Sequence, residues 1–213
     1  FLIMKIYYWD KYYKKNLKKA NPSSFAKFIF PFIKKNKTLI DIGCGNGRDS
    51  FFFSRKKINI LGIEKSKIAV KKNNILKKSL KLNNIKFKKI SVTEKKFYKL
   101  GKFDYIYSRF FLHAISYKTE KKFINNLFKI SKNKSKILLE FRTIKDPLIK
   151  KGKKISKYER LTDHYRRFID LESFKKSILK LNKFLIIYVI EKKGLAKFKL
   201  DNPVVARLIL RKK

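Results

Sequence analysis

Three glycines at alternate positions follow a short apolar run, and they constrain the fold more than any other feature of the sequence. Residues 38–50 read Thr-Leu-Ile-Asp-Ile-Gly-Cys-Gly-Asn-Gly-Arg-Asp-Ser. Gly43, Gly45 and Gly47 can adopt backbone angles closed to other residues, and they let a ligand approach the main chain without meeting a Cβ. We therefore expect a strand, a ligand-binding turn and then a helix. Asp41 ends that strand, where open α/β sheets bind their ligands.

The turn departs from the dinucleotide-binding pattern. That pattern is G-x-G-x-x-G with a pyrophosphate on the helix N-terminus, whereas this chain has G-x-G-x-G and places Arg48 where the last glycine belongs. Asp41 and Asp49 would repel a diphosphate. They suit a ligand that carries a positive amino group and a sulfonium but no phosphate, which describes S-adenosylmethionine.

An acidic residue follows the next apolar stretch. Glu64 directly follows the apolar stretch 58–63 and lies about 20 residues after Gly43. At this spacing, Rossmann-like folds have an acidic residue that binds the ribose hydroxyls. Together, Asp-Ile-Gly-Cys-Gly-Asn-Gly-Arg-Asp-Ser and Gly62-Ile-Glu64-Lys-Ser66 resemble the class I S-adenosylmethionine-dependent methyltransferases. Within that family they look most like the tellurite-resistance and thiol methyltransferase branch. The alternative is a glycine turn in some other α/β protein.

The resemblance implies an α/β, Rossmann-like methyltransferase fold with helices on both faces of a seven-stranded, mostly parallel sheet and an antiparallel final strand. Residues 1–213 would form one domain. The apolar runs 184–190 and 204–210 support the last feature, because strands joined without a long crossover helix pair antiparallel. The pattern also predicts a strand over 137–142, a helix from Phe25 to about Lys34 packed on the sheet through Phe32, and an irregular lid within 145–170.

The resemblance also implies the donor site. The expected contacts with S-adenosyl-L-methionine come from Asp41, Gly43, Cys44, Gly45, Asn46, Gly47, Glu64, Lys65 and Ser108. Relatives have an aspartate for the adenine where this chain has Ser91, so we name no adenine ligand. Cys44 is the single cysteine, and we expect it to pack in the turn and not to act as a nucleophile. One cysteine builds no disulfide framework or zinc site, so we predict no metal and a cytoplasmic protein.

The N-terminal segment 1–36 is expected to form cap helices. Residues 8–13 resemble the W-D-x-Y-Y opening of small methyltransferases, in which an N-terminal helix covers the cleft. Tyr8, Trp9 and Tyr13 are therefore candidates for acceptor binding, and the alternative is that they only pack on the core.

Two histidines and several arginines are candidates for the acceptor side. Only His113 and His164 have side chains whose unperturbed pKa lies near neutrality, so either one is a candidate for a base or an acceptor-orienting group. His113 is the better candidate, and bonding to the backbone is its alternative role. The arginine fork suits carboxylate and phosphate oxygens. The remaining predicted acceptor contacts, Arg109, Arg142, Tyr165, Arg166 and Arg167, favour a small acidic or phosphate- or carboxylate-bearing acceptor. The alternative is that Glu140 and Asp163 pair with two of these arginines.

The net charge of +43 invites a nucleic-acid function. Lysine and arginine are spread nearly evenly along the chain, however, as a coding bias toward AT-rich codons would produce. The predicted function is therefore methyl transfer to a small molecule, with an RNA methyltransferase as the less favoured alternative and a non-catalytic cofactor-binding domain as a third. No apolar run reaches the ~18 residues of a membrane span, so we expect no membrane partner. The sequence leaves monomer and dimer open, and residues could precede Phe1.

Overall fold

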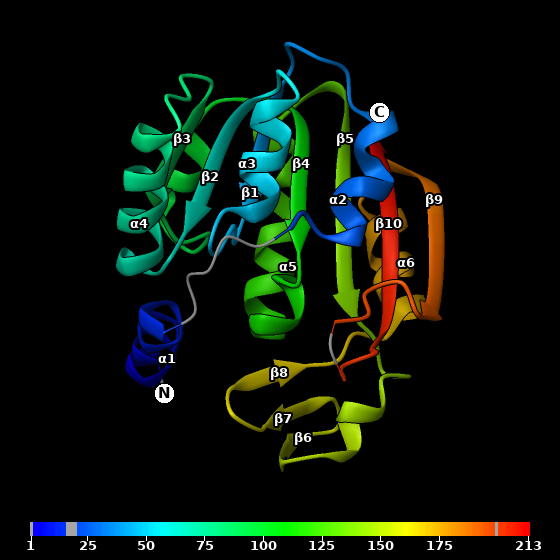
Figure 1. The fold of residues 1–213 in the computed structure, drawn as a ribbon. Helices are drawn as coiled ribbons and strands as arrows, with labels where there is room; N and C mark the ends of the chain where they lie inside the picture. The colour runs from blue at the N-terminus through cyan, green and yellow to red at the C-terminus, as the bar shows by residue number, and fades with distance from the viewer. Residues whose placement is uncertain (1, 16–20, 199) are drawn as a thin grey trace.

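A seven-stranded sheet forms the centre of the computed structural model, which describes residues 2–15, 21–198 and 200–213. The strand order is β3-β2-β1-β4-β5-β10-β9 (Figure 1). The strands are β1 (Thr38–Ile42), β2 (Asn59–Glu64), β3 (Ile85–Lys89), β4 (Phe103–Arg109), β5 (Ser131–Arg142), β9 (Phe184–Lys193) and β10 (Val204–Lys212). Strands β1 to β5 pair in parallel, whereas β10 runs antiparallel to both β5 and β9. The predicted mostly parallel sheet with an antiparallel final strand is confirmed.

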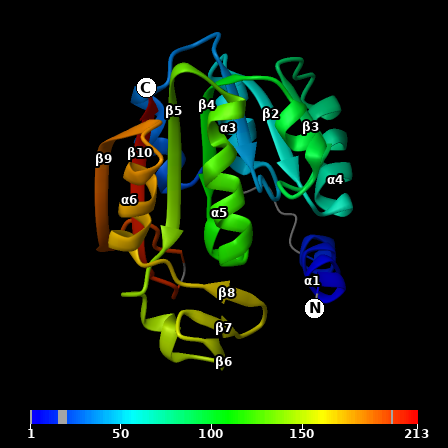
Figure 2. The same ribbon diagram turned by 180° about the vertical axis from the view of Figure 1, so that it is seen from behind.

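Helices cover both faces of this sheet. On one face lie α2 (Ser24–Ile29), α3 (Arg48–Arg55) and α4 (Lys67–Ser79), and on the other lie α5 (Tyr117–Asn126) and α6 (Leu171–Lys180) (Figure 2). The first layer buries Phe25 and Phe53 against Tyr107, and the second buries Phe123 and Phe174. Short 3-10 helices complete the connections: η1 (Phe30–Phe32), η2 (Lys95–Lys99), η3 (Leu112–Ala114), η4 (Leu127–Ile130) and η5 (Pro147–Lys150).

Two smaller units flank the carboxyl ends of the parallel strands. Helix α1 (Leu2–Lys15) lies beyond the end of β2 and next to α4, and a three-stranded antiparallel sheet of β6 (Lys153–Ser156), β7 (Glu159–Leu161) and β8 (Tyr165–Arg167) lies beyond β5 (Figure 1). The edge of the sheet where α/β proteins bind ligands therefore sits between these two units.

Three expectations about local structure were wrong. The segment 145–162 is not irregular, because η5, β6 and β7 lie in it. Strand β5 begins at Ser131, six residues before the expected start at Ile137, because its polar first half still pairs at Ser131 with Phe103 of β4. Phe32 is 42% exposed and not packed on the sheet, because Pro31 ends α2 at Ile29 and a 3-10 turn follows.

Every helix in the part of the chain that the structure describes is too short or too polar to cross a membrane. In the same described residues, no three histidine, cysteine, aspartate or glutamate side chains gather as metal ligands.

Candidate functional site

The glycine turn holds a left-handed backbone at all three predicted positions. Gly43, Gly45 and Gly47 have φ of 72°, 56° and 71°, values that a Cβ disfavours. The amides of Gly43 and Cys44 donate to the carbonyl of Ile63 at 2.9 and 3.1 Å. These bonds tie the turn to the end of β2, so β1 and β2 present one continuous backbone surface to a ligand.

Two buried carboxylates border this surface. Glu64 accepts hydrogen bonds from the amides of Gly45 (3.1 Å), Lys65 (2.7 Å) and Ser66 (3.0 Å). Asp41 accepts from the Ser50 hydroxyl at 2.5 Å. Burial raises the pKa of both groups, that of Asp41 to about 8. Both carboxylates are therefore poorly compensated by the protein itself, and a cationic ligand would stabilise their charged forms.

The remaining donor-site residues fit a small polar ligand. Strand β4 lies beside β1, and its Ser108 hydroxyl is buried without a hydrogen-bond partner among the described residues. Such an orphaned group is costly unless a ligand satisfies it. Burial lowers the pKa of Lys65. The Asn46 side chain accepts weakly from the Arg48 amide at 3.5 Å. The predicted donor-binding residues thus gather at the ends of three adjacent strands, and they fit S-adenosylmethionine.

Cys44 has the packing role that the sequence favoured. Its sulfur lies 3.1 Å from where a Cβ on Gly62 would be. Burial raises the pKa of the thiol well above its usual value, which keeps the sulfur protonated and unreactive.

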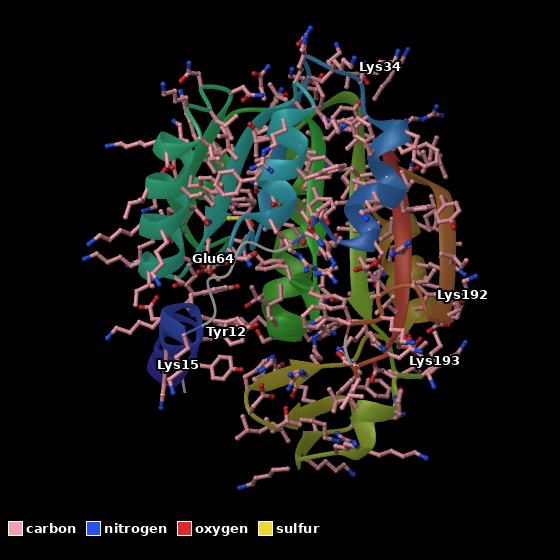
Figure 3. All side chains as sticks on the ribbon, in the orientation of Figure 1. Tyr12, Lys15, Lys34, Glu64, Lys192 and Lys193 are labelled. Atoms are coloured by element: carbon pink, nitrogen blue, oxygen red, sulfur yellow. The ribbon has the colours of Figure 1, made fainter. Side chains whose placement is uncertain are left out.

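Helix α1 closes over the glycine turn. The Tyr13 hydroxyl occupies the place that a Cβ on Gly45 would need. Asp10 accepts from the Ser66 hydroxyl at 2.5 Å, and Ser66 in turn caps α4 by accepting from the Ala69 amide. Figure 3 labels Glu64 at the end of β2 and Tyr12 in α1, the helix that lies beyond that strand end.

Sequence reasoning missed three contributors to this closed arrangement. Asp10 and Ser66 join α1 to α4, and Asn73 donates to the Gly45 carbonyl at 2.8 Å. Asp10 lies within the W-D-x-Y-Y stretch and Ser66 lies two residues after Glu64, so their positions were visible. Their contacts were not, because they join segments more than 50 residues apart.

A small aromatic cavity lies between α1 and the β6–β8 sheet. It measures about 20 Å³ and is lined by Tyr8, Trp9, Ala114, His164 and Tyr165. The imidazole of His164 lies 4.8 Å from the Tyr8 ring and 5.1 Å from the Trp9 ring, and Trp9 stacks on Tyr13 at 5.9 Å. This row of rings connects the predicted acceptor residues to the glycine turn. The cavity holds about one water molecule, so an acceptor of ordinary size requires α1 to move.

The two histidines have different surroundings. His113 is buried, and its Nδ1 accepts from the Arg142 amide at 3.3 Å. That is the backbone-bonding role that the sequence left as an alternative. His164 Nδ1 lies 3.0 Å from Asp163 Oδ2 and 3.1 Å from the Tyr8 hydroxyl. Burial, followed by nearby arginine charge, lowers the pKa of His113 well below its usual value and that of His164 to about 4. Both imidazoles are therefore neutral at neutral pH.

All four predicted acceptor-binding arginines pair with carboxylates. Arg109 bonds Glu140 at 2.8 Å, and Arg207 bonds the other oxygen of Glu140 at 2.7 Å. Arg166 bonds Asp163 at 2.5 Å. The remaining pairs are Arg142 with Asp146 and Asp201, and Arg167 with Glu120. The structure therefore contains the ion pairs of the predicted alternative, with Glu140 bound to Arg109 and Asp163 bound to Arg166.

The chain is similar to known methyltransferases in sequence pattern and in fold. A family model described as a methyltransferase domain matches residues 33–194, whereas no curated protein matches. Among solved structures, an S-adenosylmethionine-dependent methyltransferase from Methanosarcina mazei has a TM-score of 0.73 at 16% identity, covering 87% of this chain and 96% of that one. TehB from Haemophilus influenzae has a TM-score of 0.67 at 16% identity, covering 88% and 61%. The [4+2]-cyclase SpnF has a TM-score of 0.69 at 14% identity, covering 88% and 79%.

The fold and the glycine-turn site define a class I methyltransferase, and the family match extends over most of the chain. The chain therefore belongs to the methyltransferase domain family and is an S-adenosylmethionine-dependent methyltransferase. The likeness to SpnF shows that the fold by itself does not fix the reaction.

Proposed function

We propose that this chain transfers the methyl group of S-adenosylmethionine to a small-molecule acceptor held between α1 and the β6–β8 sheet. The observation that carries the proposal is the pair of buried carboxylates, Asp41 and Glu64, beside a turn of three glycines at positive φ that Tyr13 of α1 covers. Their raised pKa values favour a ligand with positive charge and disfavour a diphosphate. The main-chain surface of the turn, Glu64 and Ser108 are the groups that would hold the donor.

The donor supplies an electrophilic methyl carbon when it is bound, and the chain must supply position and dryness. The aromatic walls of Tyr8, Trp9 and Tyr165 exclude all but about one water molecule from the acceptor side. Such exclusion favours a reaction in which opposite charges are neutralised. Because Tyr13 covers Gly45, α1 must first move away and then close over the ligands. In this proposal α1 acts as a cap, and the β6–β8 sheet forms the other wall of the acceptor site.

The acidic acceptor stays a prediction with reduced support. Each candidate arginine already has a carboxylate partner, so an anionic acceptor would have to compete with a preformed ion pair. An acceptor without charge needs no such exchange.

The RNA alternative rests on one further observation. An open groove of about 550 Å³ lies where β3 ends and is lined by Lys88, Lys89, Lys96 and Lys99 together with two apolar residues. Lysines also project from many sides of the molecule, as Lys15, Lys34 and Lys192 show in Figure 3. That spread favours a generally basic surface over one built for nucleic acid.

A product assay for S-adenosylhomocysteine tests the proposal. The panel contains hydroxyl compounds, thiols, acidic metabolites, phosphorylated sugars and RNA, and we expect turnover with a small molecule. Calorimetry with the donor and with a pyridine dinucleotide accompanies it. No heat with the donor and tight binding of the dinucleotide would overturn the donor assignment. RNA turnover that falls steeply with salt would replace the small acceptor.

A further inference from the structure

Asp163 and His164 form a preorganised pair in the turn between β7 and β8. The Thr162 amide donates to the His164 carbonyl at 3.2 Å, which holds the turn tight. Asp163 Oδ2 lies 3.0 Å from His164 Nδ1 and accepts from the Tyr8 hydroxyl at 2.7 Å. Asp163 Oδ1 accepts from Thr162 at 2.8 Å and from Arg166. Every partner of this carboxylate is a donor, so it is ionised and fixed in place.

This arrangement selects one tautomer of His164. An ionised carboxylate only accepts hydrogen bonds. The proton of the neutral imidazole must therefore sit on Nδ1, and the lone pair is left on Nε2. Within the described part of the chain Nε2 has no hydrogen-bond partner, although His164 lines the aromatic cavity. His113 has the opposite arrangement, because its Nδ1 accepts from a backbone amide and its proton must sit on Nε2.

The surroundings of His164 keep its imidazole neutral at neutral pH. Asp163 faces it from its own turn and Tyr8 faces it from α1, while Arg166 in β8, Arg142 at the end of β5 and His113 in η3 lie close enough to affect its titration. Burial and the arginines oppose protonation, whereas the Asp163 carboxylate stabilises the imidazolium once it forms. Burial raises the pKa of Asp163, but hydrogen bonds from Arg166, Tyr8 and Thr162 outweigh it and hold that pKa well below its usual range.

We propose that His164 Nε2 is the general base of the reaction, that Asp163 is the residue that positions it, and that the acceptor is a neutral hydroxyl or thiol compound. This inference rests on the proposed function, because it concerns the acceptor side of the same site. The acceptor O–H or S–H gives its proton to Nε2 as the oxygen or sulfur forms a bond to the methyl carbon. The bond from that carbon to the donor sulfur breaks and its electron pair stays on the sulfur. The imidazolium then passes its proton to water.

Nuclear magnetic resonance of ¹⁵N-histidine-labelled protein without donor tests the pair directly. The chain has two histidines, and a His113→Asn variant assigns them. At neutral pH we expect His164 to carry its proton on Nδ1 and His113 on Nε2. Asp163→Asn introduces an amide that can donate to Nδ1, so His164 should shift toward the Nε2–H tautomer. Tyr8→Phe keeps the carboxylate and should keep the Nδ1–H tautomer. Nε2–H in the unaltered protein, or no change in Asp163→Asn, would overturn the proposal.

Turnover supplies the second test, in a series of hydroxyl and thiol acceptors of graded pKa. His164→Gln should lower kcat by about 10²–10⁴-fold for acceptors that are protonated at the assay pH. The loss should shrink for acceptors that are already ionised. An equal loss across the series would overturn the base assignment. Calorimetry should show that His164→Gln still binds the donor, which separates loss of the base from loss of the donor site. If the unaltered protein neither binds the donor nor methylates any acceptor, the proposed function itself is refuted.

Discussion

Donor binding should release a proton from Asp41. In the free protein burial, together with the neighbouring Asp49 and Glu64 charges, holds the pKa of Asp41 at about 8, although a hydrogen bond from Ser50 opposes the shift. Asp41 is therefore mostly protonated at pH 7. A cationic ligand beside it favours the charged form, so binding expels the proton and affinity rises with pH.

The size of the effect follows from that pKa. The donor binds the form of the protein in which Asp41 is ionised. Its apparent dissociation constant is therefore the constant for that form multiplied by one plus the ratio of protonated to ionised Asp41. With a pKa of about 8, that factor is about 100 at pH 6 and about 11 at pH 7, so affinity should rise about ninefold across this unit. The same ratio gives release of about 0.9 proton per donor bound at pH 7.

Calorimetry in buffers of different ionisation enthalpy measures the protons released. Asp41→Asn should lose most of this release. Asp104→Asn is the matched control. Burial raises the pKa of Asp104, but hydrogen bonds from Lys132 and Thr38 and the Lys132 charge outweigh it and hold that pKa at about 2. Asp104 is therefore ionised at both pH 6 and pH 7. An affinity that is flat between pH 6 and pH 7 without proton release, or equal release in Asp41→Asn, would refute the reasoning.

Two further predictions, each with a control variant, concern the turn and the buried ion pairs. Gly45→Ala and Gly194→Ala both place a side chain at positive φ, at a backbone cost of about 1–2 kcal/mol each, which urea unfolding measures; Gly45→Ala also displaces the Tyr13 hydroxyl and should cost more than Gly194→Ala. Only Gly45→Ala should also weaken donor binding in calorimetry, because nothing lies within 4 Å of the added group at Gly194; equal affinities would contradict the placement of the donor. Glu140→Gln removes a fully buried charge between Arg109 and Arg207 and should lower the free energy of unfolding by about 3–5 kcal/mol. The exposed Glu172→Gln should cost less than about 1 kcal/mol, and a similar loss in both would refute the role of burial.

The parts of the fold that could be predicted are those with strong local patterns. The apolar run 38–42 is β1, and the apolar runs that begin at residues 184 and 204 form the antiparallel pair β9 and β10. Alternation and length carry enough information there. The strands of the β6–β8 sheet have only three or four residues each and β6 is fully exposed, so no apolar alternation marked them. Their stability comes from cross-strand pairing, which a local pattern does not reveal.

The donor side of the site could be predicted more completely than the acceptor side. A glycine turn and a carboxylate at fixed spacing are local to β1 and β2, and the structure brings Asp41, Glu64 and Ser108 to adjacent strand ends. The arginines were chosen by residue type and, for Arg109 and Arg142, by their places at the ends of predicted strands. Their partners lie up to 59 residues away in the chain, as Asp201 does from Arg142, so the sequence could not show that each was already paired.

The ranking of His113 and His164 as candidate bases also depends on partners that are distant in the sequence. The sequence placed His113 first because it follows the end of β4, but its lone pair is used by the Arg142 amide. His164 gains its role from Asp163 and from Tyr8, which lies 155 residues from Asp163 in the sequence. Helix α1 therefore contributes at both ends of the site, through Tyr13 over the glycine turn and through Tyr8 at the Asp163–His164 pair. A movement of α1 that admits the donor would also remove Tyr8 from the pair, so the surroundings of the proposed base would be complete only when the cap is closed.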